Sequence, residues 1–95
     1  MEYNMAYCQE KYARVAKAMG LSFETVEEGA KAAVEAVKQL CRDVGLPTFR
    51  SLNVGEENFD QIAEMSARNI STGSNPRPMS KEDYLTVLRS AYAAE

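Results

Sequence analysis

The chain has 95 residues and a formal net charge of −3 at pH 7, and it contains no histidine. A chain of this length forms one domain or part of one. Acidic and basic residues are interleaved, so the positive stripe typical of nucleic-acid-binding proteins is missing. No apolar run approaches the roughly 18 residues of a membrane span, and the first residues do not resemble a signal peptide. We therefore expect a cytoplasmic protein that binds neither nucleic acid nor membranes.

The first helical pattern covers residues 5–19. Gly20 follows it and is expected to cap the helix, because glycine adopts the left-handed conformation without steric cost. Only Asn4 is a candidate for the start, which fits either a helix that began earlier in a longer chain or fraying at a terminus. The apolar face consists of Met5, Cys8, Tyr12, Val15, Ala16 and Met19.

The second pattern, over residues 26–44, has the clearest boundaries. Thr25 with Glu28 three positions later has the spacing of a capping box, and Gly45 with Pro47 ends the helix. The alanines on its apolar face would let a neighbouring helix approach closely. That face consists of Ala30, Ala33, Val34, Val37, Leu40, Cys41 and Val44. Glu27 and Lys31 are spaced to form an ion pair.

Two further helices follow a connector over residues 46–52. The third begins near Glu56 or Asn58, carries Phe59, Ile62, Ala63, Ser66 and Ala67 on one face, and allows a pair between Glu64 and Arg68. The fourth begins after Ser80, which forms a capping box with Asp83, and Met79 and Tyr84 stand at hydrophobic-staple positions. Its inward face is Tyr84, Leu85, Leu88, Ala91 and Tyr92. No run alternates with period two, so the sequence predicts an all-α, four-helix bundle-like fold.

Few residues are candidates for chemistry. Without histidine the chain contains no Ser–His or Cys–His pair, and it has no glycine-rich phosphate motif. Cys8 and Cys41 are interpreted as buried thiols rather than a disulfide, and they do not make a zinc site. Glu56 and Glu57 are interpreted as stabilising a helix start rather than as an acid–base pair, and Asp60 and Glu64 as part of a solvated face. The five methionines fit core filling better than an adaptable binding groove.

The segment from Ser71 to Pro78 differs from the rest of the chain. Asn75 and Arg77 each precede a proline, which disfavours helical geometry at both. A small polar loop of this kind could line a cleft and contact a ligand. The alternative is that Asn75 and Arg77 bond only nearby backbone or carboxylates and fix the entry into the fourth helix.

Four segments, in order, resemble the C-terminal end of the iron-containing, group III alcohol dehydrogenases. The most specific is Asn75-Pro76-Arg77-Pro78, followed by Ser80-Lys81-Glu82-Asp83 and a helix from Tyr84. The others are Met1–Asn4 with Lys11–Ala16, the turn Val44-Gly45-Leu46-Pro47-Thr48, and Ser51–Val54 with Phe59–Ala67. The resemblance covers essentially the whole chain.

This resemblance implies an NAD(P)-linked alcohol or aldehyde oxidoreductase. Its nucleotide domain would bind the cofactor through a glycine-rich turn, and its helical domain would bind divalent iron through one aspartate and three histidines. No residue of this chain matches a metal ligand or that turn, so these parts would lie upstream. Residues 1–95 would be a single helical segment of the larger helical domain. In the family the loop approaches the cleft, which makes Ser71, Thr72 and Gly73 candidate cleft-lining residues.

We therefore expect no catalytic, cofactor-binding or metal-binding residue on this chain alone, and no dehydrogenase activity from it. The expected partner is the upstream domain, or a second copy bound through an exposed apolar face. The rival hypothesis is a stand-alone helical interaction module. A small-ligand carrier is a third hypothesis without a supporting motif.

Overall fold

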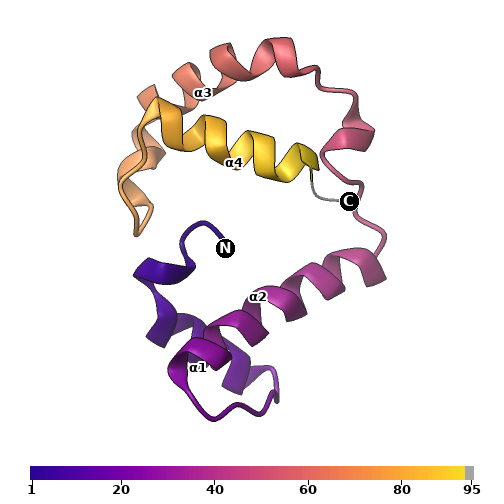
Figure 1. The fold of residues 1–95 in the computed structure, drawn as a ribbon, viewed down its shortest axis with the longest axis vertical. Coiled ribbons are helices and arrows are strands. Elements are labelled where there is room, and N and C mark those ends of the chain that lie inside the picture. Colours follow the sequence, from indigo (N-terminus) through magenta and orange to yellow (C-terminus); the bar gives the residue numbers. More distant parts are fainter. Residues whose placement is uncertain (94–95) are drawn as a thin grey trace. The chain divides into compact units, whose positions relative to one another are not determined.

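The computed structural model describes residues 1–93, which form helices and no strand. The four α-helices are α1 (Gln9–Ala18), α2 (Val26–Asp43), α3 (Phe59–Arg68) and α4 (Lys81–Ala93), as Figure 1 shows. Short 3₁₀ turns are η1 (Met5–Tyr7), η2 (Arg50–Leu52), η3 (Glu56–Asn58) and η4 (Ile70–Ser74). The predicted all-α fold class is confirmed.

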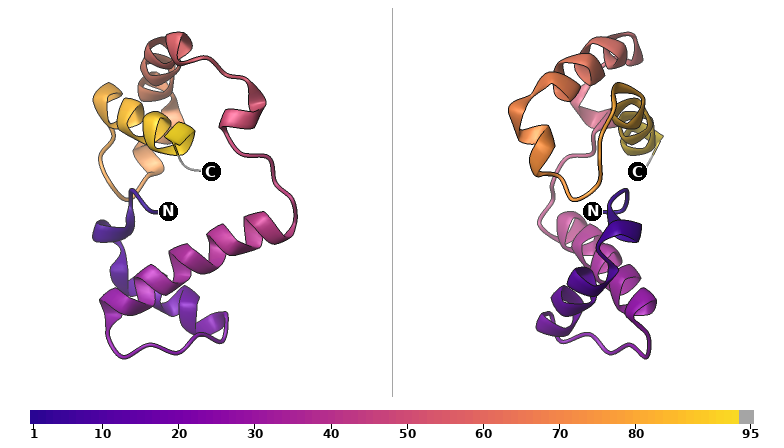
Figure 2. Two further views of the ribbon diagram at one scale, coloured as in Figure 1. Left: turned by 45° about the vertical axis from the view of Figure 1, so that its right-hand side comes forward. Right: turned by 90° about the vertical axis from the view of Figure 1, so that its left-hand side faces the viewer.

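The chain divides into two compact units, each built on one helix pair. The N-terminal unit, Met1–Leu46, contains α1 and α2, and the C-terminal unit, from Pro47 onward, contains α3 and α4. Both pairs can be followed in Figure 2. The prediction that residues 1–95 make a single segment of a larger domain stays a prediction.

The boundaries of α2 are those that the sequence predicts. Thr25 Oγ1 accepts a hydrogen bond from the Glu28 N–H at 3.1 Å, and the Glu28 carboxylate accepts one from the Glu24 N–H at 3.1 Å. In the usual capping box the Glu28 carboxylate would accept from the N–H of Thr25, the N-cap residue, whereas here it accepts from the residue before it. At the other end, Gly45 has a φ of +73° directly after the last turn of α2.

The first helix differs from its prediction. Cys8 has φ −144° and ψ 39°, outside the helical region, so Met5–Tyr7 form a separate 3₁₀ turn and α1 starts at Gln9. The Cys8 thiol is buried and donates to the Asn4 carbonyl at 3.0 Å. The predicted apolar face is also partly wrong, since Val15 and Met19 are exposed. Gly20 does cap the helix, with a φ of +81°.

Small residues close the α1–α2 pair. Its buried side chains are Cys8, Ala13, Ala16, Ala30, Ala33 and Val34. Gly29 faces the same contact, where a Cβ atom would lie 2.9 Å from the Ala13 Cβ and 2.8 Å from ring carbons of Phe23. The two helices approach closely because neither carries a large side chain where they meet.

The C-terminal half of α2 is not covered by α1. With 10 residues against 18, α1 is about 15 Å long and α2 about 27 Å, so α2 continues beyond its partner (Figure 1). Leu40 and Val44, which belong to the predicted apolar face, are 52% and 64% exposed. That face is buried only in its first half, and Leu46 extends the exposed part.

An aromatic cluster closes the C-terminal unit. The Phe59 ring is buried and packs edge-on against Phe49 and Tyr92, with centroids 5.7 Å away in each case. Arg50 lies 4.7 Å from the centroid of the Tyr92 ring, and its Nε donates to the Tyr92 carbonyl at 3.1 Å. The connector before α3 is thereby bound to the last turns of α4.

The predicted capping box of α4 is confirmed. The Ser80 N–H donates to the Asp83 carboxylate at 2.9 Å, and the Asp83 N–H donates to Ser80 Oγ at 3.2 Å. Aspartate therefore replaces the usual glutamate without loss of the reciprocal pair. This cap fixes where α4 starts after the Ser71–Pro78 segment.

Candidate functional site

The segment between α3 and α4 contains a 3₁₀ turn where the sequence predicts an irregular loop. Asn69 starts the turn, since its side-chain oxygen accepts a hydrogen bond from the Ser71 N–H at 2.8 Å. An asparagine side chain that bonds the backbone two residues on is a common turn device. The turn places Ser71 and Gly73 at the surface and Thr72 half-buried between them.

Thr72 is directed toward the helix pair. Its hydroxyl oxygen lies 2.6 Å from the Ser66 carbonyl oxygen of α3 and 2.7 Å from the Tyr84 hydroxyl oxygen of α4. Of the three candidate cleft-lining residues, Thr72 is thus occupied with internal bonds. Ser71 and Gly73 are the two that the structure leaves accessible.

Gly73 has no structural need to be glycine within the described chain. Its φ is not positive, and an added Cβ atom would meet nothing within 4 Å. Glycine is usually required where the backbone is left-handed or another group approaches closely. Neither condition holds here, so contacts within the described residues do not require glycine at position 73.

The proline-flanked part of the segment fixes the entry into α4. The Asn75 side-chain amide donates to the Arg77 carbonyl at 2.8 Å, and both residues are half-buried. This bond is of the local backbone kind that the alternative interpretation expected. It restrains the chain between Pro76 and Pro78, whose φ angles are already fixed.

The acidic candidates of the C-terminal unit do not form an acid–base pair. Asp60 forms an ion pair with Lys81 at 2.9 Å, and Glu64 forms one with Arg68 at 2.7 Å. The hydrogen bond that the Lys81 ammonium donates to the Asp60 carboxylate raises the pKa of Lys81. Glu56 and Glu57 are exposed in the 3₁₀ turn that leads into α3. These contacts fit solvated helix surfaces.

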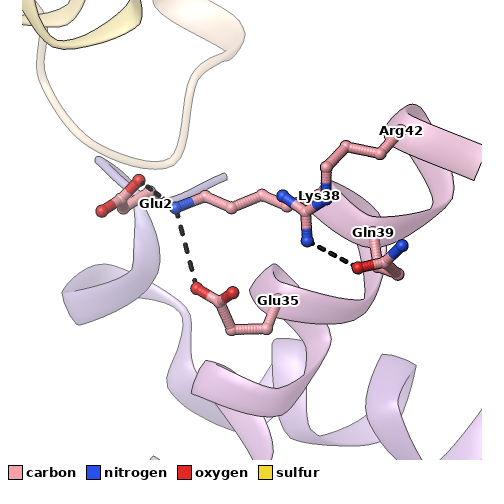
Figure 3. A network of polar contacts seen from close by, with 5 residues as sticks. All are labelled: Glu2, Glu35, Lys38, Gln39 and Arg42. Atoms are coloured by element: carbon pink, nitrogen blue, oxygen red, sulfur yellow. Dashed lines mark hydrogen bonds and ion pairs between the residues drawn. The ribbon is translucent and has the colours of Figure 1, made fainter. Parts of the chain in front are cut away.

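The N-terminal unit has a comparable surface network, drawn in Figure 3. Lys38 lies 2.8 Å from Glu2 and 3.7 Å from Glu35, while Arg42 bonds Gln39 at 2.7 Å. The hydrogen bond with Glu2 is the main cause that raises the pKa of Lys38. The predicted pair between Glu27 and Lys31 is present at 3.4 Å.

Partial burial perturbs one further group of this unit. It raises the pKa of the Tyr12 hydroxyl, and the neighbouring Cys8 thiol adds to that effect. Tyr12 therefore stays protonated and neutral at physiological pH. A protonated phenol next to a thiol lacks the base that would activate a nucleophile.

The residues of this chain do not fit an iron site. Divalent iron in proteins is held by sets of histidine and carboxylate ligands. The sequence has no histidine, and residues 1–93 hold no group of three or more histidine, cysteine, aspartate or glutamate side chains that could bind a metal. Cys8 and Cys41 are free thiols, and Cys41 is only partly buried, contrary to its prediction.

None of the helices within residues 1–93 combines the length and apolarity needed to cross a membrane.

The sequence of residues 1–92 matches the Fe-containing alcohol dehydrogenase family, in its C-terminal part. The chain belongs to this family. The resemblance drawn from the Asn75-Pro76-Arg77-Pro78 segment and its companions is therefore confirmed.

Similar proteins of this family are enzymes several times longer. Lactaldehyde reductase of Escherichia coli (strain K12) is 38% identical over 97% of this chain and 25% of its own length. The 1,3-propanediol dehydrogenase of Klebsiella pneumoniae is 31% identical over 95% of this chain and 24% of its own. NADPH-dependent butanol dehydrogenase of Clostridium saccharobutylicum is 29% identical over 97% and 25%. The chain thus spans about a quarter of the length of these relatives.

A solved structure with a similar name has the same fold in its matching part. A crystal structure of 1,3-propanediol oxidoreductase matches 95% of this chain and 24% of its own chain, with 31% identity and a TM-score of 0.90. The match supports the helical part of the family fold as the architecture of this chain.

Sequence reasoning missed the residues that hold the candidate loop. The Ser66 carbonyl and the Tyr84 hydroxyl both bond Thr72, and no sequence pattern links these three positions. The role of Asn69 had a signal, because its spacing to Ser71 is that of an asparagine turn. Arg50 had none, since its partner Tyr92 lies 42 residues away.

Proposed function

We propose that this chain is the C-terminal helical part of an iron-dependent, NAD(P)-linked alcohol or aldehyde oxidoreductase of the cytoplasm. In the whole enzyme it completes the helical domain and one wall of the interdomain cleft. The observation that carries the proposal is the match of residues 1–92 to the family. The names of the similar proteins support the reaction class, because each is a reductase or dehydrogenase.

Residues 1–95 alone carry out no hydride transfer. Their sequence has no glycine-rich nucleotide turn, and residues 1–93 hold no set of side chains that could bind iron. The contribution of this chain is structural, and Ser71 and Gly73 are the residues through which it borders the cleft. The substrate alcohol and the choice between NAD and NADP are set by the other parts of such an enzyme.

The exposed apolar residues at the end of α2 and just after it form the docking surface for those other parts. They are Leu40 in α2, and Val44 and Leu46 after its last residue, and all three are more than half exposed. The relatives carry about three quarters of their length outside the region matched by this chain. A polypeptide of that size can cover an apolar face that the α1–α2 pair leaves bare.

Complementation tests the proposal. The purified chain is assayed with Fe²⁺, NADH or NADPH and lactaldehyde, and then coexpressed with Escherichia coli lactaldehyde reductase lacking its matching C-terminal quarter. We expect no turnover from either part alone and turnover from the assembled pair. Turnover by the chain alone, or failure of the two parts to assemble, would contradict the proposal.

A matched pair of variants tests the docking surface. Val44→Glu places a charge in the exposed apolar face and should abolish assembly, whereas Glu35→Gln on a polar face of α2 should not. A defined homodimer of the chain, broken by Val44→Glu, would instead show that a second copy covers this face. A monomer with a cooperative melt and no assembly would favour the stand-alone interaction module.

A further inference from the structure

We propose that Tyr84 is a positioning residue for the candidate cleft-lining loop. Through Thr72 it holds the η4 turn in the conformation that leaves Ser71 and Gly73 accessible. The anchoring itself is a property of the C-terminal unit. Only its importance for an active site rests on the proposed function.

The direction of the hydrogen bonds follows from counting protons. A threonine hydroxyl has one proton and can accept at two lone pairs, while a carbonyl oxygen only accepts. Thr72 must therefore donate its proton to the Ser66 carbonyl, 2.6 Å away. The bond between Thr72 and Tyr84, at 2.7 Å, then has Tyr84 as its donor.

The resulting chain of bonds joins three elements. It runs from the Tyr84 hydroxyl on α4 through the Thr72 hydroxyl in η4 to the Ser66 carbonyl on α3. The backbone bonds from the Thr72 N–H to the Asn69 carbonyl and from the Asn75 N–H to the Thr72 carbonyl stay within the loop. The hydroxyl chain ties the turn to both helices, and the Asn69 N–H adds a backbone bond to the Ser66 carbonyl of α3.

Tyr84 is itself fixed, which makes it a suitable anchor. It lies in the first turn of α4, where its N–H donates to the Ser80 carbonyl at 3.1 Å. The capping box between Ser80 and Asp83 sets the register of the same turn. Both ends of the anchor are half-buried, so water competes less well for these bonds than at an exposed pair.

The pattern of dependence is specific. Removing the phenol oxygen with Tyr84→Phe keeps the ring but leaves Thr72 without its donor. Removing the hydroxyl with Thr72→Val breaks both bonds and leaves the Ser66 carbonyl without that partner. Thr72→Ser keeps the hydroxyl and should keep the anchor. Tyr92→Phe is the matched control, because the described contacts of Tyr92 use its ring and its backbone carbonyl.

The experiment is amide hydrogen exchange, followed by NMR on the full 95-residue chain. In Tyr84→Phe we expect exchange at the Thr72 and Asn75 amides to rise about threefold to tenfold, as loss of one hydrogen bond allows. Tyr92→Phe and Thr72→Ser should leave both amides within about twofold of wild type. Adding Tyr84→Phe to Thr72→Val should produce no further change, because the two act through one bond.

Three results would overturn the proposal. One is unchanged exchange at Thr72 and Asn75 in Tyr84→Phe, which decides the matter even if Thr72→Val does not fold. Another is that Tyr84→Phe accelerates amide exchange equally in the wild-type and in the Thr72→Val background. The third is equal acceleration at Ala63 in the core of α3, which would make Tyr84 a general packing residue.

A kinetic readout separates the anchor from the proposed function. In the complemented enzyme, Tyr84→Phe should raise the KM for the aldehyde about threefold and leave kcat within about twofold, since it displaces a wall of the cleft rather than a reacting group. Altered exchange with unchanged kinetics would leave the anchor intact and refute the placement of the loop at the cleft. Failed complementation with altered exchange would refute the proposed function alone.

Discussion

The two units of this chain close a helix pair in different ways. In the N-terminal unit, alanines and Gly29 let two helix backbones meet directly, and the largest buried side chain is Val34. In the C-terminal unit α3 and α4 pack around one buried ring, Phe59, and two polar contacts, Arg50 with Tyr92 and Thr72 with Tyr84, join further parts of the unit to α4. The stability of the α1–α2 pair is therefore distributed over many small contacts. That of the α3–α4 pair depends on a few large side chains.

The largest expected effect is at the aromatic centre. Phe59→Ala should destabilise the C-terminal unit by about 3–5 kcal/mol, because it removes a buried ring and leaves a cavity between Phe49 and Tyr92. Amide signals of α3 and α4 should lose protection in hydrogen exchange. Signals of α1 and α2 should keep theirs, and equal loss in both units would show that they unfold as one.

The converse test is to enlarge the close contact in the N-terminal unit. Gly29→Ala should destabilise it by about 1–2 kcal/mol, because the new methyl clashes with Ala13 and the Phe23 ring. The steric cost of that clash exceeds the stabilisation that the higher helix propensity of alanine provides. Gly73→Ala is the control, expected within about 0.5 kcal/mol, since open space surrounds that position. Thermal melts compare the two, and a neutral Gly29→Ala would show that the helices can move apart freely.

Loss of the contacts between Arg50 and Tyr92 of α4 should have a smaller effect. Arg50→Gln loses the contact with the Tyr92 ring and the bond to its carbonyl, at a cost of about 1 kcal/mol. Arg68→Gln removes an exposed one-turn ion pair with Glu64 and should cost at most about 0.5 kcal/mol. Urea unfolding of both variants provides the comparison. Equal losses of unfolding free energy would mean that Arg50 contributes no more than an exposed surface charge.

The smallest expected effect is a pH dependence in the N-terminal unit. Because the pKa of Lys38 is raised above its usual 10.5, mainly by Glu2, the pair stabilises the folded state below that pH. The stabilisation is lost as pH rises through the folded pKa. Both side chains are well exposed, so it amounts to tenths of a kcal/mol. The stability difference between wild type and Lys38→Gln should be constant from neutral pH to about pH 9.5 and vanish above the folded pKa.

Local signals in the sequence predicted most of the helix boundaries. Thr25, Gly45 and Ser80 act through bonds within four residues, so their effects can be inferred from neighbours alone. The break at Cys8 could not, because an apolar residue at helical spacing fits a continuous helix equally well. Burial was predicted too far along α2, since periodicity shows which face is apolar but not how far a partner extends.

The candidate site was predicted only in outline. The Ser71–Pro78 segment was recognised from its composition and its family resemblance, but the opposite exposures of Thr72 and its two neighbours were not. Which of three adjacent small residues faces inward depends on Tyr84 and Ser66, and those contacts arise only when α3 and α4 pack. A tertiary contact of this kind leaves no mark on local spacing.

The boundary between the two units at Leu46 also affects the order in which they fold during synthesis. Each unit makes its helix contacts between segments close in sequence, and such pairs form in microseconds to milliseconds. A ribosome adds about 5–20 residues per second, so the α1–α2 pair has seconds to form before α3 and α4 are complete. Under the proposed function the upstream domain is synthesised first, so it can cover the exposed Leu40, Val44 and Leu46 during that interval, before α3 and α4 are complete.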